Sequence, residues 1–368
     1  MSSNHKSPTG HAWRSPFRRA ILASLLVLVS ASLLSCETLQ FYSQAVRGQL
    51  AIVMNREDIQ RLLDGGELDA RLAGVFREVM DIRRFAAGEL LLPVDENYVS
   101  YVDVEREHVV WNVFAAPEFS TDPISWCFPI AGCVTYRGYF SEQGALRYAT
   151  ALEAEGYDVY TGGVDAYSTL GWFDDSLLST VISRDNHQLA GLIFHELAHQ
   201  VVYVPGDTTF NESFATAVER EGVRRWLLTT GREQLIKRAD LNQRRQREFV
   251  ALVTEYRQRL QTLYDTELDI DAMRNGKSMI QSELRGAYSN LKTEWGGYSG
   301  YDDWFSRSLN NAQLATVSSY NDLVPHFDAL LARLKGDLAR FYAEVEALGK
   351  LDTESRQARL QSFLGPAY

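Results

Sequence analysis

The chain has 368 residues, of which 45% are hydrophobic and 11% aromatic, and its formal net charge is −11. A chain of this length and composition can bury a proper core, so it is globular, and its length allows two or three domains. The negative charge argues against nucleic acid or anionic lipid as a binding partner.

The first 35 residues have the features of a secretory signal. Arginines precede an apolar run over residues 20–34, which is too short for a comfortable membrane span. The run ends in Leu-Leu-Ser-Cys36, which resembles the bacterial lipobox, where the cysteine is acylated and becomes the mature N-terminus. We therefore expect a signal peptide over residues 1–35 and a lipid anchor at Cys36. Because Glu37 replaces the aspartate of the inner-membrane retention signal, the expected location is the outer membrane, facing the periplasm. An uncleaved membrane anchor and plain secretion are the alternatives.

Residues 39–85 have a helical pattern that is interrupted at Gly65-Gly66. Five later segments alternate in polarity or are rich in β-forming residues. They are residues 98–102, 108–114, 134–140, 157–160 and 164–170. The first three predict a small antiparallel sheet. A helix is expected over residues 143–155, before the last two strands.

Cys127 and Cys133 are the cysteines that remain once Cys36 carries a lipid. An even pair in an oxidising compartment predicts a disulfide bond. Because the closed loop is short, we expect the bond to contribute only about 2 kcal/mol. Metal binding by the pair is the alternative, and it lacks the further Cys or His ligands of a structural zinc site.

The segment His195-Glu196-Leu-Ala-His199 carries the strongest chemical signal. On a helix the two histidines stand one turn apart on the same face, so both imidazoles can reach one ion. A catalytic zinc takes three protein ligands and leaves a position for water, and Glu196 is the predicted general base. The flanking residues are apolar, so the helix is buried and its polar groups need partners. The alternative is a core helix whose polar residues are satisfied by neighbours.

Glu212 is the predicted third ligand. Pro205-Gly206-Asp207 breaks the first helix, and a second helix over about residues 209–228 folds back on it. Glu212 then falls in or near the first turn, close to His199. The alternative is an acidic residue placed at a helix N-terminus for the dipole. Glu219 lies about two turns farther along, as a partner of a ligand or as a surface charge.

After Gly231 the chain changes to long charged helices. Two sets of apolar residues recur at spacings of three and four. They are Phe249, Val253, Tyr256, Leu260 and Leu263, and then Phe327, Leu331, Leu334, Leu338 and Phe341. These stripes predict seams between packed helices. A separate coiled coil that binds a partner is the alternative.

The pairing of His-Glu-Leu-Ala-His-Gln with the later Asn211-Glu-Ser213-Phe-Ala resembles the gluzincin metallopeptidases, especially aminopeptidase-N-like enzymes. Ser213 stands where the family has a glycine, and the linker between the two motifs is shorter than the usual gluzincin spacing. The whole chain resembles a bacterial family of lipoproteins described as putative aminopeptidases, notably over residues 126–140 and 169–175. The resemblance implies a gluzincin-like catalytic region over residues 36–230, with a helical region over 231–368 packed on it.

The resemblance also implies how a peptide is held. Gluzincins place a substrate-pairing edge strand shortly before the zinc helix, and here that position ends at Asp174 and Asp175, which are candidates to bind the free amine. Solvated acids that cap the next helix are the alternative. By the same likeness Tyr320 is a candidate donor to the oxyanion.

Together these features predict an α+β fold, with a small, mainly antiparallel sheet beside a buried zinc-helix hairpin and a long-helix C-terminal region. The predicted function is a zinc-dependent aminopeptidase that binds one Zn²⁺ and acts on peptides, without nucleic acid as a partner. A zinc endopeptidase is the first alternative. A non-catalytic envelope lipoprotein with a structural metal is the second, and Glu196 weighs against it because a structural site has no use for a base.

Overall fold

The protein is described by a computed structural model over residues 39–128, 132–166, 174–318 and 323–364. The chain divides into two compact units, residues 1–50 and 51–368. Residues 39–54 are helical. The sheets, the predicted zinc-helix hairpin and the candidate site all belong to the second unit.

The predicted N-terminal signal and lipidation site at Cys36 lie outside the described residues. Within the described residues, no helix combines the length and apolar character needed to cross a membrane.

The predicted break in the first helical segment is confirmed. Helix α2 spans Ile59–Gly65 and ends at Gly66, which adopts the left-handed conformation with φ 69°. Helix α3 spans Ala70–Glu89, and the Asp69 carboxylate caps its first turn. Glycine ends α2 because it takes positive φ without a steric penalty.

The strands form three small sheets instead of one. In the largest, β3 (Val110–Pro117) lies between β6 (Arg137–Tyr139) and β7 (Tyr157–Val164), antiparallel to both. The second sheet joins β1 (Glu57–Asp58), β2 (Ser100–Val102) and β8 (Leu177–Leu178), and β2 and β8 are parallel. The third pairs β4 (Trp126–Phe128) with β5 (Gly132–Val134). Helix α4 spans Glu142–Ala154.

The prediction that a new strand starts at Val164 is wrong, because Val164 is the last residue of β7. The preceding Gly162-Gly163 pair suggests a turn, yet both glycines stay in register with β3. A Cβ on Gly163 would lie 2.0 Å from the ring of His108, so glycine is needed here to leave room for that ring. Residues 165 and 166 are not in a strand, and residues 167–170, the end of the predicted strand, lie outside the described residues.

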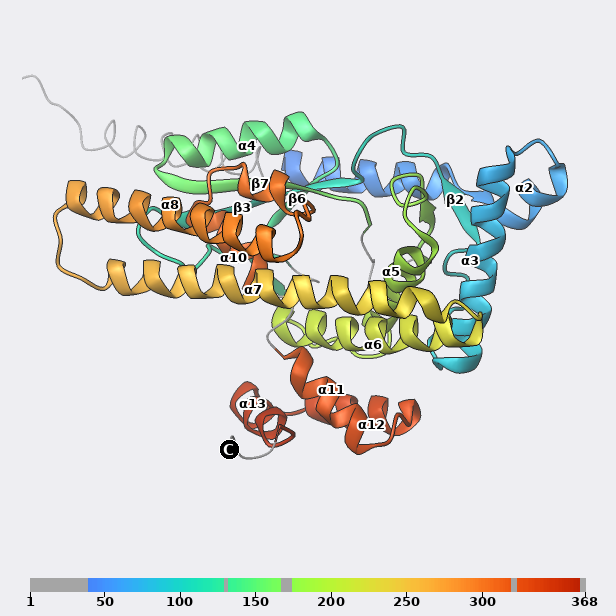
Figure 1. Ribbon diagram of the computed structural model, residues 1–368. Coiled ribbons are helices and arrows are strands. Elements are labelled where there is room, and N and C mark those ends of the chain that lie inside the picture. Colours follow the sequence, from blue (N-terminus) through green and yellow to red (C-terminus); the bar gives the residue numbers. More distant parts are fainter. Residues whose placement is uncertain (1–38, 129–131, 167–173, 319–322, 365–368) are drawn as a thin grey trace, which may run out of the picture. The chain divides into compact units, whose positions relative to one another are not determined.

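The predicted helical hairpin consists of α5 (Asn186–His199) and α6 (Thr208–Thr229) (Figure 1). Asp185 and Gln188 form a capping box at the start of α5. Gly206, with φ 81°, lies in the turn, and the Asp207 carboxylate accepts a hydrogen bond from the Phe210 amide at the start of α6. These caps fix where each helix begins, and therefore which residues of α6 face the end of α5.

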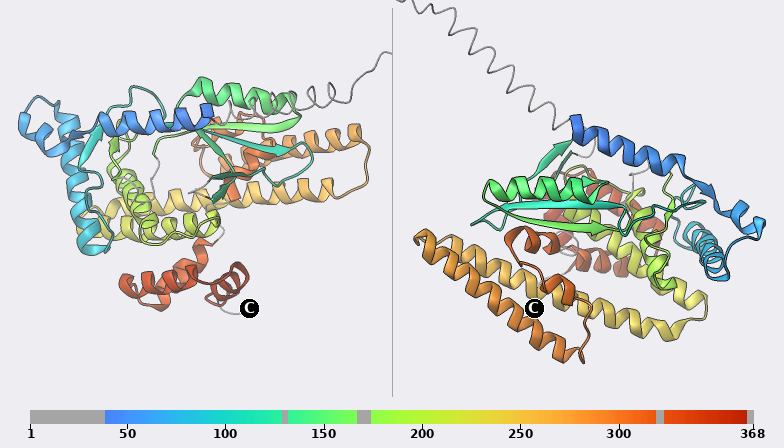
Figure 2. Two further views of the ribbon diagram at one scale, coloured as in Figure 1. Left: turned by 180° about the vertical axis from the view of Figure 1, so that it is seen from behind. Right: turned by 90° about the horizontal axis from the view of Figure 1, so that it is seen from above.

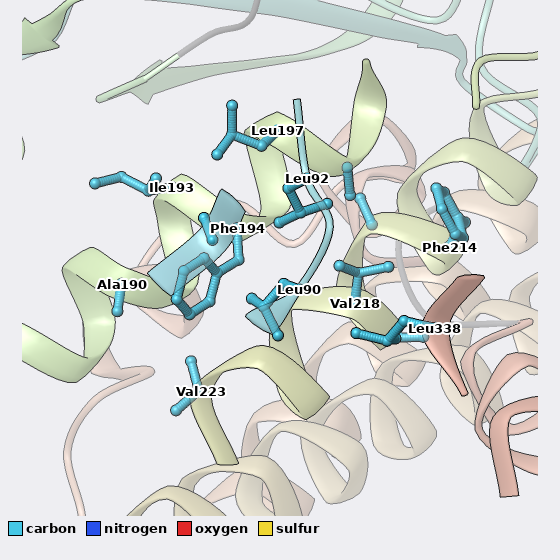
Figure 3. Close-up of a cluster of buried hydrophobic side chains, with 14 of the residues drawn as sticks. Leu90, Leu92, Ala190, Ile193, Phe194, Leu197, Phe214, Val218, Val223 and Leu338 are labelled. Carbon is cyan, nitrogen blue, oxygen red and sulfur yellow. The ribbon is translucent and has the colours of Figure 1, made fainter. Parts of the chain in front are cut away.

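Apolar side chains of α5 and α6 meet in the main core (Figure 3). Phe194 and Phe214 are fully buried there, together with Leu90, which follows α3. Two glycines allow the close approach of the helices. A Cβ on Gly191 would lie 3.2 Å from the Glu219 carboxylate, and one on Gly222 would lie 2.7 Å from the Phe194 ring.

The C-terminal half is helical, as predicted. A short 3₁₀ turn, Glu233–Leu235, leads into α7 (Ile236–Tyr264) and α8 (Ile270–Glu294), which run side by side (Figures 1 and 2). The first predicted stripe contributes Phe249, Val253, Tyr256 and Leu260 to a second core between these helices. The remaining helices are α9 (Asp302–Phe305), α10 (Asn311–Ser318), α11 (Val324–Arg333), α12 (Leu338–Gly349) and α13 (Thr353–Gln361).

The second predicted stripe does not lie on one long helix. Helix α11 ends at Arg333, Gly336 takes a left-handed φ of 77°, and Asp337 caps α12. The spacing of the apolar residues continues across this turn because both short helices pack on the main core through Phe327, Leu331, Leu338 and Phe341. Periodicity alone therefore misses the break.

The two helix glycines Gly222 and Gly286 provide a matched stability test. Alanine gains roughly 1 kcal/mol of helix propensity over glycine. At the exposed Gly286 of α8 a Cβ meets nothing within 4 Å, so Gly286→Ala should raise the free energy of unfolding. At Gly222 the Cβ would lie 2.7 Å from Phe194 and 2.8 Å from Leu90, both buried. Overpacking costs about 1–3 kcal/mol, so Gly222→Ala should be destabilising overall. Urea unfolding of both variants checks this, and equal stabilisation would contradict the packing account.

Candidate active site

The hairpin brings His195, His199 and Glu212 together at one end of α5. Nε2 of His195 lies 3.2 Å from Oε2 of Glu212, and Nε2 of His199 lies 3.6 Å from the same oxygen. One ligand atom from each side chain falls within 4.8 Å of the other two. His199 is buried, and the other two side chains are partly buried. The group could therefore hold a metal ion.

The spacing of these atoms fits zinc. Zinc binds histidine nitrogen and carboxylate oxygen at about 2.0–2.2 Å in a tetrahedral arrangement, which separates neighbouring ligand atoms by about 3.4 Å. The measured separations of 3.2 and 3.6 Å lie on either side of that value. Two imidazoles and one carboxylate are also the donor set that leaves the fourth zinc position open.

Glu219 approaches the other nitrogen of His195. Its Oε2 lies 3.1 Å from Nδ1, so it is a hydrogen-bond partner of His195 and not an unattached surface charge. A carboxylate in this position fixes the tautomer and orientation of a ligand imidazole. Burial lowers the pKa of His195, and the hydrogen bonds with Glu212 and Glu219 outweigh burial and raise it well above its usual value. Burial raises the pKa of Glu212, but both histidines lower it to about 2.

Glu196 lies next to this group without belonging to it. Burial raises the pKa of its carboxyl group, the two histidines oppose that rise, and Asp175 adds to it. The side chain lines a cleft of about 500 Å³ together with His195 and Glu219. Glu196 therefore faces a space that a substrate can enter.

Of the two acidic residues predicted to bind the substrate amine, Asp175 is the one whose side chain turns inward. It is 7% exposed, and its Oδ2 accepts a 3.4 Å hydrogen bond from Nε2 of Gln200, the residue after His199. The side chain of Asn97 accepts a hydrogen bond from the backbone amide of Asp175 at 2.8 Å and also contacts Gln200. This network holds Asp175 near Glu196.

Asp174 has a different environment. It is exposed, and its backbone carbonyl accepts a hydrogen bond from Arg56. The structure therefore separates the two predicted candidates and places Asp175, not Asp174, beside Glu196.

Tyr320 lies outside the described residues. Three other tyrosines lie close to the acidic groups of the site. Burial and the charges of Asp175 and Glu196 raise the pKa of Tyr98 well above its usual value. Burial and nearby carboxylates, Glu212 first among them, raise the pKa of Tyr136 to about 12, and Tyr203 is shifted upward by burial and Glu212. No spacing rule singles out these tyrosines among eighteen, so sequence reasoning missed them.

Cys127 and Cys133 are joined by a disulfide bond, with an S–S distance of 2.00 Å. The bond links the paired strands β4 and β5. A Cβ on Gly132 would lie 3.7 Å from the backbone nitrogen of Gly206. The disulfide-closed hairpin therefore packs against the turn between α5 and α6.

No curated protein and no solved structure gave a significant match. A family model described as "Putative aminopeptidase" matches residues 40–360. The match includes α5, α6 and all three residues of the candidate metal site, and it covers most of the chain. The protein therefore belongs to this aminopeptidase family.

Proposed function

We propose that the protein is a zinc-dependent aminopeptidase. The observation that carries the proposal is the convergence of His195, His199 and Glu212 at zinc-ligand spacing, with Glu196 beside them and facing the cleft. Membership of the aminopeptidase family supports the same reaction.

In this proposal His195, His199 and Glu212 hold one zinc ion, and Glu219 orients the His195 ring through Nδ1. A bound zinc lowers the pKa of water and polarises a carbonyl group. Glu196 accepts the proton of the attacking water and delivers it to the leaving amine. The apolar residues around α5 limit the access of bulk water, which strengthens these electrostatic interactions.

Asp175 is the proposed anchor for the substrate ammonium. It is a buried carboxylate near Glu196, and an ammonium group taken into a partly buried site requires an opposite charge. The hydrogen bond from Gln200 holds the carboxylate in place. An amine bound there lies next to the position at which Glu196 acts, as cleavage of the first residue of a peptide requires.

We further propose that the protein works in the bacterial cell envelope, anchored by a lipid on Cys36. The support is the signal-like segment before that cysteine. Peptides in the periplasm are then the substrates.

Glu196→Gln tests the mechanism. Glutamine preserves the shape of the side chain but cannot act as a base, and general-base catalysis is typically worth about 10²–10⁴-fold. We expect kcat/KM for free-amine peptides to fall by at least about a hundredfold, while bound zinc stays at one per chain by elemental analysis. If the variant retains full activity, Glu196 is not the base. If the wild-type protein hydrolyses no peptide, the proposed function fails.

Asp175→Asn tests the amine anchor, with Asp174→Asn as the matched control. Loss of a hydrogen bond to a charged group costs about 1.5–3 kcal/mol, or roughly 10- to 150-fold in kcat/KM for peptides with a free amine. Asp174→Asn should leave the rate unchanged because that side chain is exposed. Zinc content should be intact in both proteins. Acetylated peptides are expected to be poor substrates throughout, and rapid cleavage of them by the wild-type protein would identify an endopeptidase instead.

A further inference from the structure

The cleft beside Glu196 continues along the two helices that carry the metal ligands. On α5 it is lined by Gln188, Leu192, His195 and Glu196, and on α6 by Thr216, Glu219, Arg220 and Val223. These positions repeat at spacings of three and four, so each set occupies one face of its helix. Helix α7 forms the third wall with Asn242 and Gln243. The cleft is thus an extension of the metal site.

The chemistry of the lining changes along the cleft. Glu196 and Glu219 lie at the metal end, and amide side chains with Arg220 lie beyond them. The Arg220 side chain is only 15% exposed, and its nearest carboxylate, Asp328, is 3.5 Å from Nη1. This is a loose ion pair for a largely buried guanidinium, which can make five hydrogen bonds in a fork suited to a carboxylate.

His187 is a second polar residue that lines the cleft. His187 is 7% exposed, and its Nε2 is buried without a hydrogen bond among the described residues. Buried polar atoms are nearly always satisfied, so an unpaired one in a cleft points to a ligand.

The direction of the peptide follows from α5. Asp175, the proposed amine anchor, is held by Gln200 beyond the C-terminal end of the helix. The cleft extends the other way, towards Gln188 near the N-terminal end. A peptide whose amine lies at Asp175 and whose first peptide bond lies at Glu196 therefore directs its remaining residues into the cleft.

The distance from the candidate metal site to Arg220 sets how many residues of the peptide lie in the cleft. Glu212 and Arg220 are eight residues apart on α6, or about 12 Å along the helix axis. An extended peptide advances about 3.3–3.6 Å per residue, so three or four residues span this distance.

We propose that this cleft binds the leaving part of the substrate, and that Arg220 recognises a carboxylate three or four residues beyond the cleaved bond. The substrate class is then short peptides, bound through the C-terminal carboxylate or through an acidic side chain at the same distance. This inference rests on the proposed aminopeptidase function. Arg220 is a specificity-determining residue in it.

The test compares alanine tetra- and pentapeptides with their C-terminal amides. We expect kcat/KM for the free acids to exceed that for the amides by about tenfold or more, as for a hydrogen bond between charged groups. Arg220→Gln should remove this difference, mainly by lowering kcat/KM for the free acids. Arg224→Gln is the matched control, because Arg224 lies on the same helix but pairs with Glu221 and does not line the cleft. An amidated peptide with aspartate at its fourth or fifth position separates the two sources of the carboxylate.

Restored hydrolysis of the aspartate peptide identifies an acidic side chain as the ligand, and preference for free acids alone identifies the C-terminus. Equal rates on acids and amides, or a preference that survives in Arg220→Gln, overturn the inference but leave the aminopeptidase function intact. Calorimetric titration of the Glu196→Gln protein with the same peptides provides a readout independent of turnover. If no peptide is hydrolysed, tighter binding of the acids that depends on Arg220 still supports the cleft, and equal binding of acids and amides contradicts it.

Discussion

The packing of α5 against α6 is the contact on which the candidate site depends. The candidate ligands come from the last turns of α5 and from Glu212 near the start of α6, so their separation is set by how closely the two helices approach. Gly191 and Gly222 permit that approach, and Phe194 and Phe214 fill the remaining space in the core. A change of an ångström in this contact would move Glu212 relative to both histidines.

The same packing brings several carboxylates and two imidazoles together at a partly buried place, where a protein does not normally hold so many ionisable groups. Glu196, Glu212 and Glu219 lie beside two imidazoles, with Asp175 near enough to raise the pKa of Glu196. Burial of so many carboxylates requires opposite charge. A divalent cation bound by His195, His199 and Glu212 would supply it. The Asp207–Arg356 ion pair, at 2.7 Å, joins the start of α6 to α13. The C-terminal helices thus help to hold the turn that places Glu212.

Much of this arrangement follows from local sequence patterns. The histidine spacing, the break at Pro205-Gly206 and the cap at Asp207 predict two helices with Glu212 opposite His199, and the three side chains do meet. Position within the cleft does not follow from local patterns. The sequence alone does not distinguish the neighbouring residues Asp174 and Asp175. Contacts with Asn97 and Gln200, which are distant in the chain or on another element, hold Asp175 as the one that turns inward. Arg220 likewise lines a cleft only because α7, more than fifteen residues farther along the chain, forms the opposite wall. Glycine has different roles at two places that look alike in the sequence. Gly336 takes a left-handed conformation in the turn between α11 and α12, whereas Gly162 and Gly163 stay paired with β3 inside strand β7.

Anomalous X-ray diffraction from crystals of the purified mature protein, recorded on both sides of the zinc absorption edge, tests the central claim most directly. The account predicts one strong peak per chain that disappears below the edge, at about 2.0–2.2 Å from a nitrogen of His195, a nitrogen of His199 and an oxygen of Glu212. Full zinc occupancy at other residues, or no anomalous peak between these three side chains in protein supplied with zinc, would contradict it.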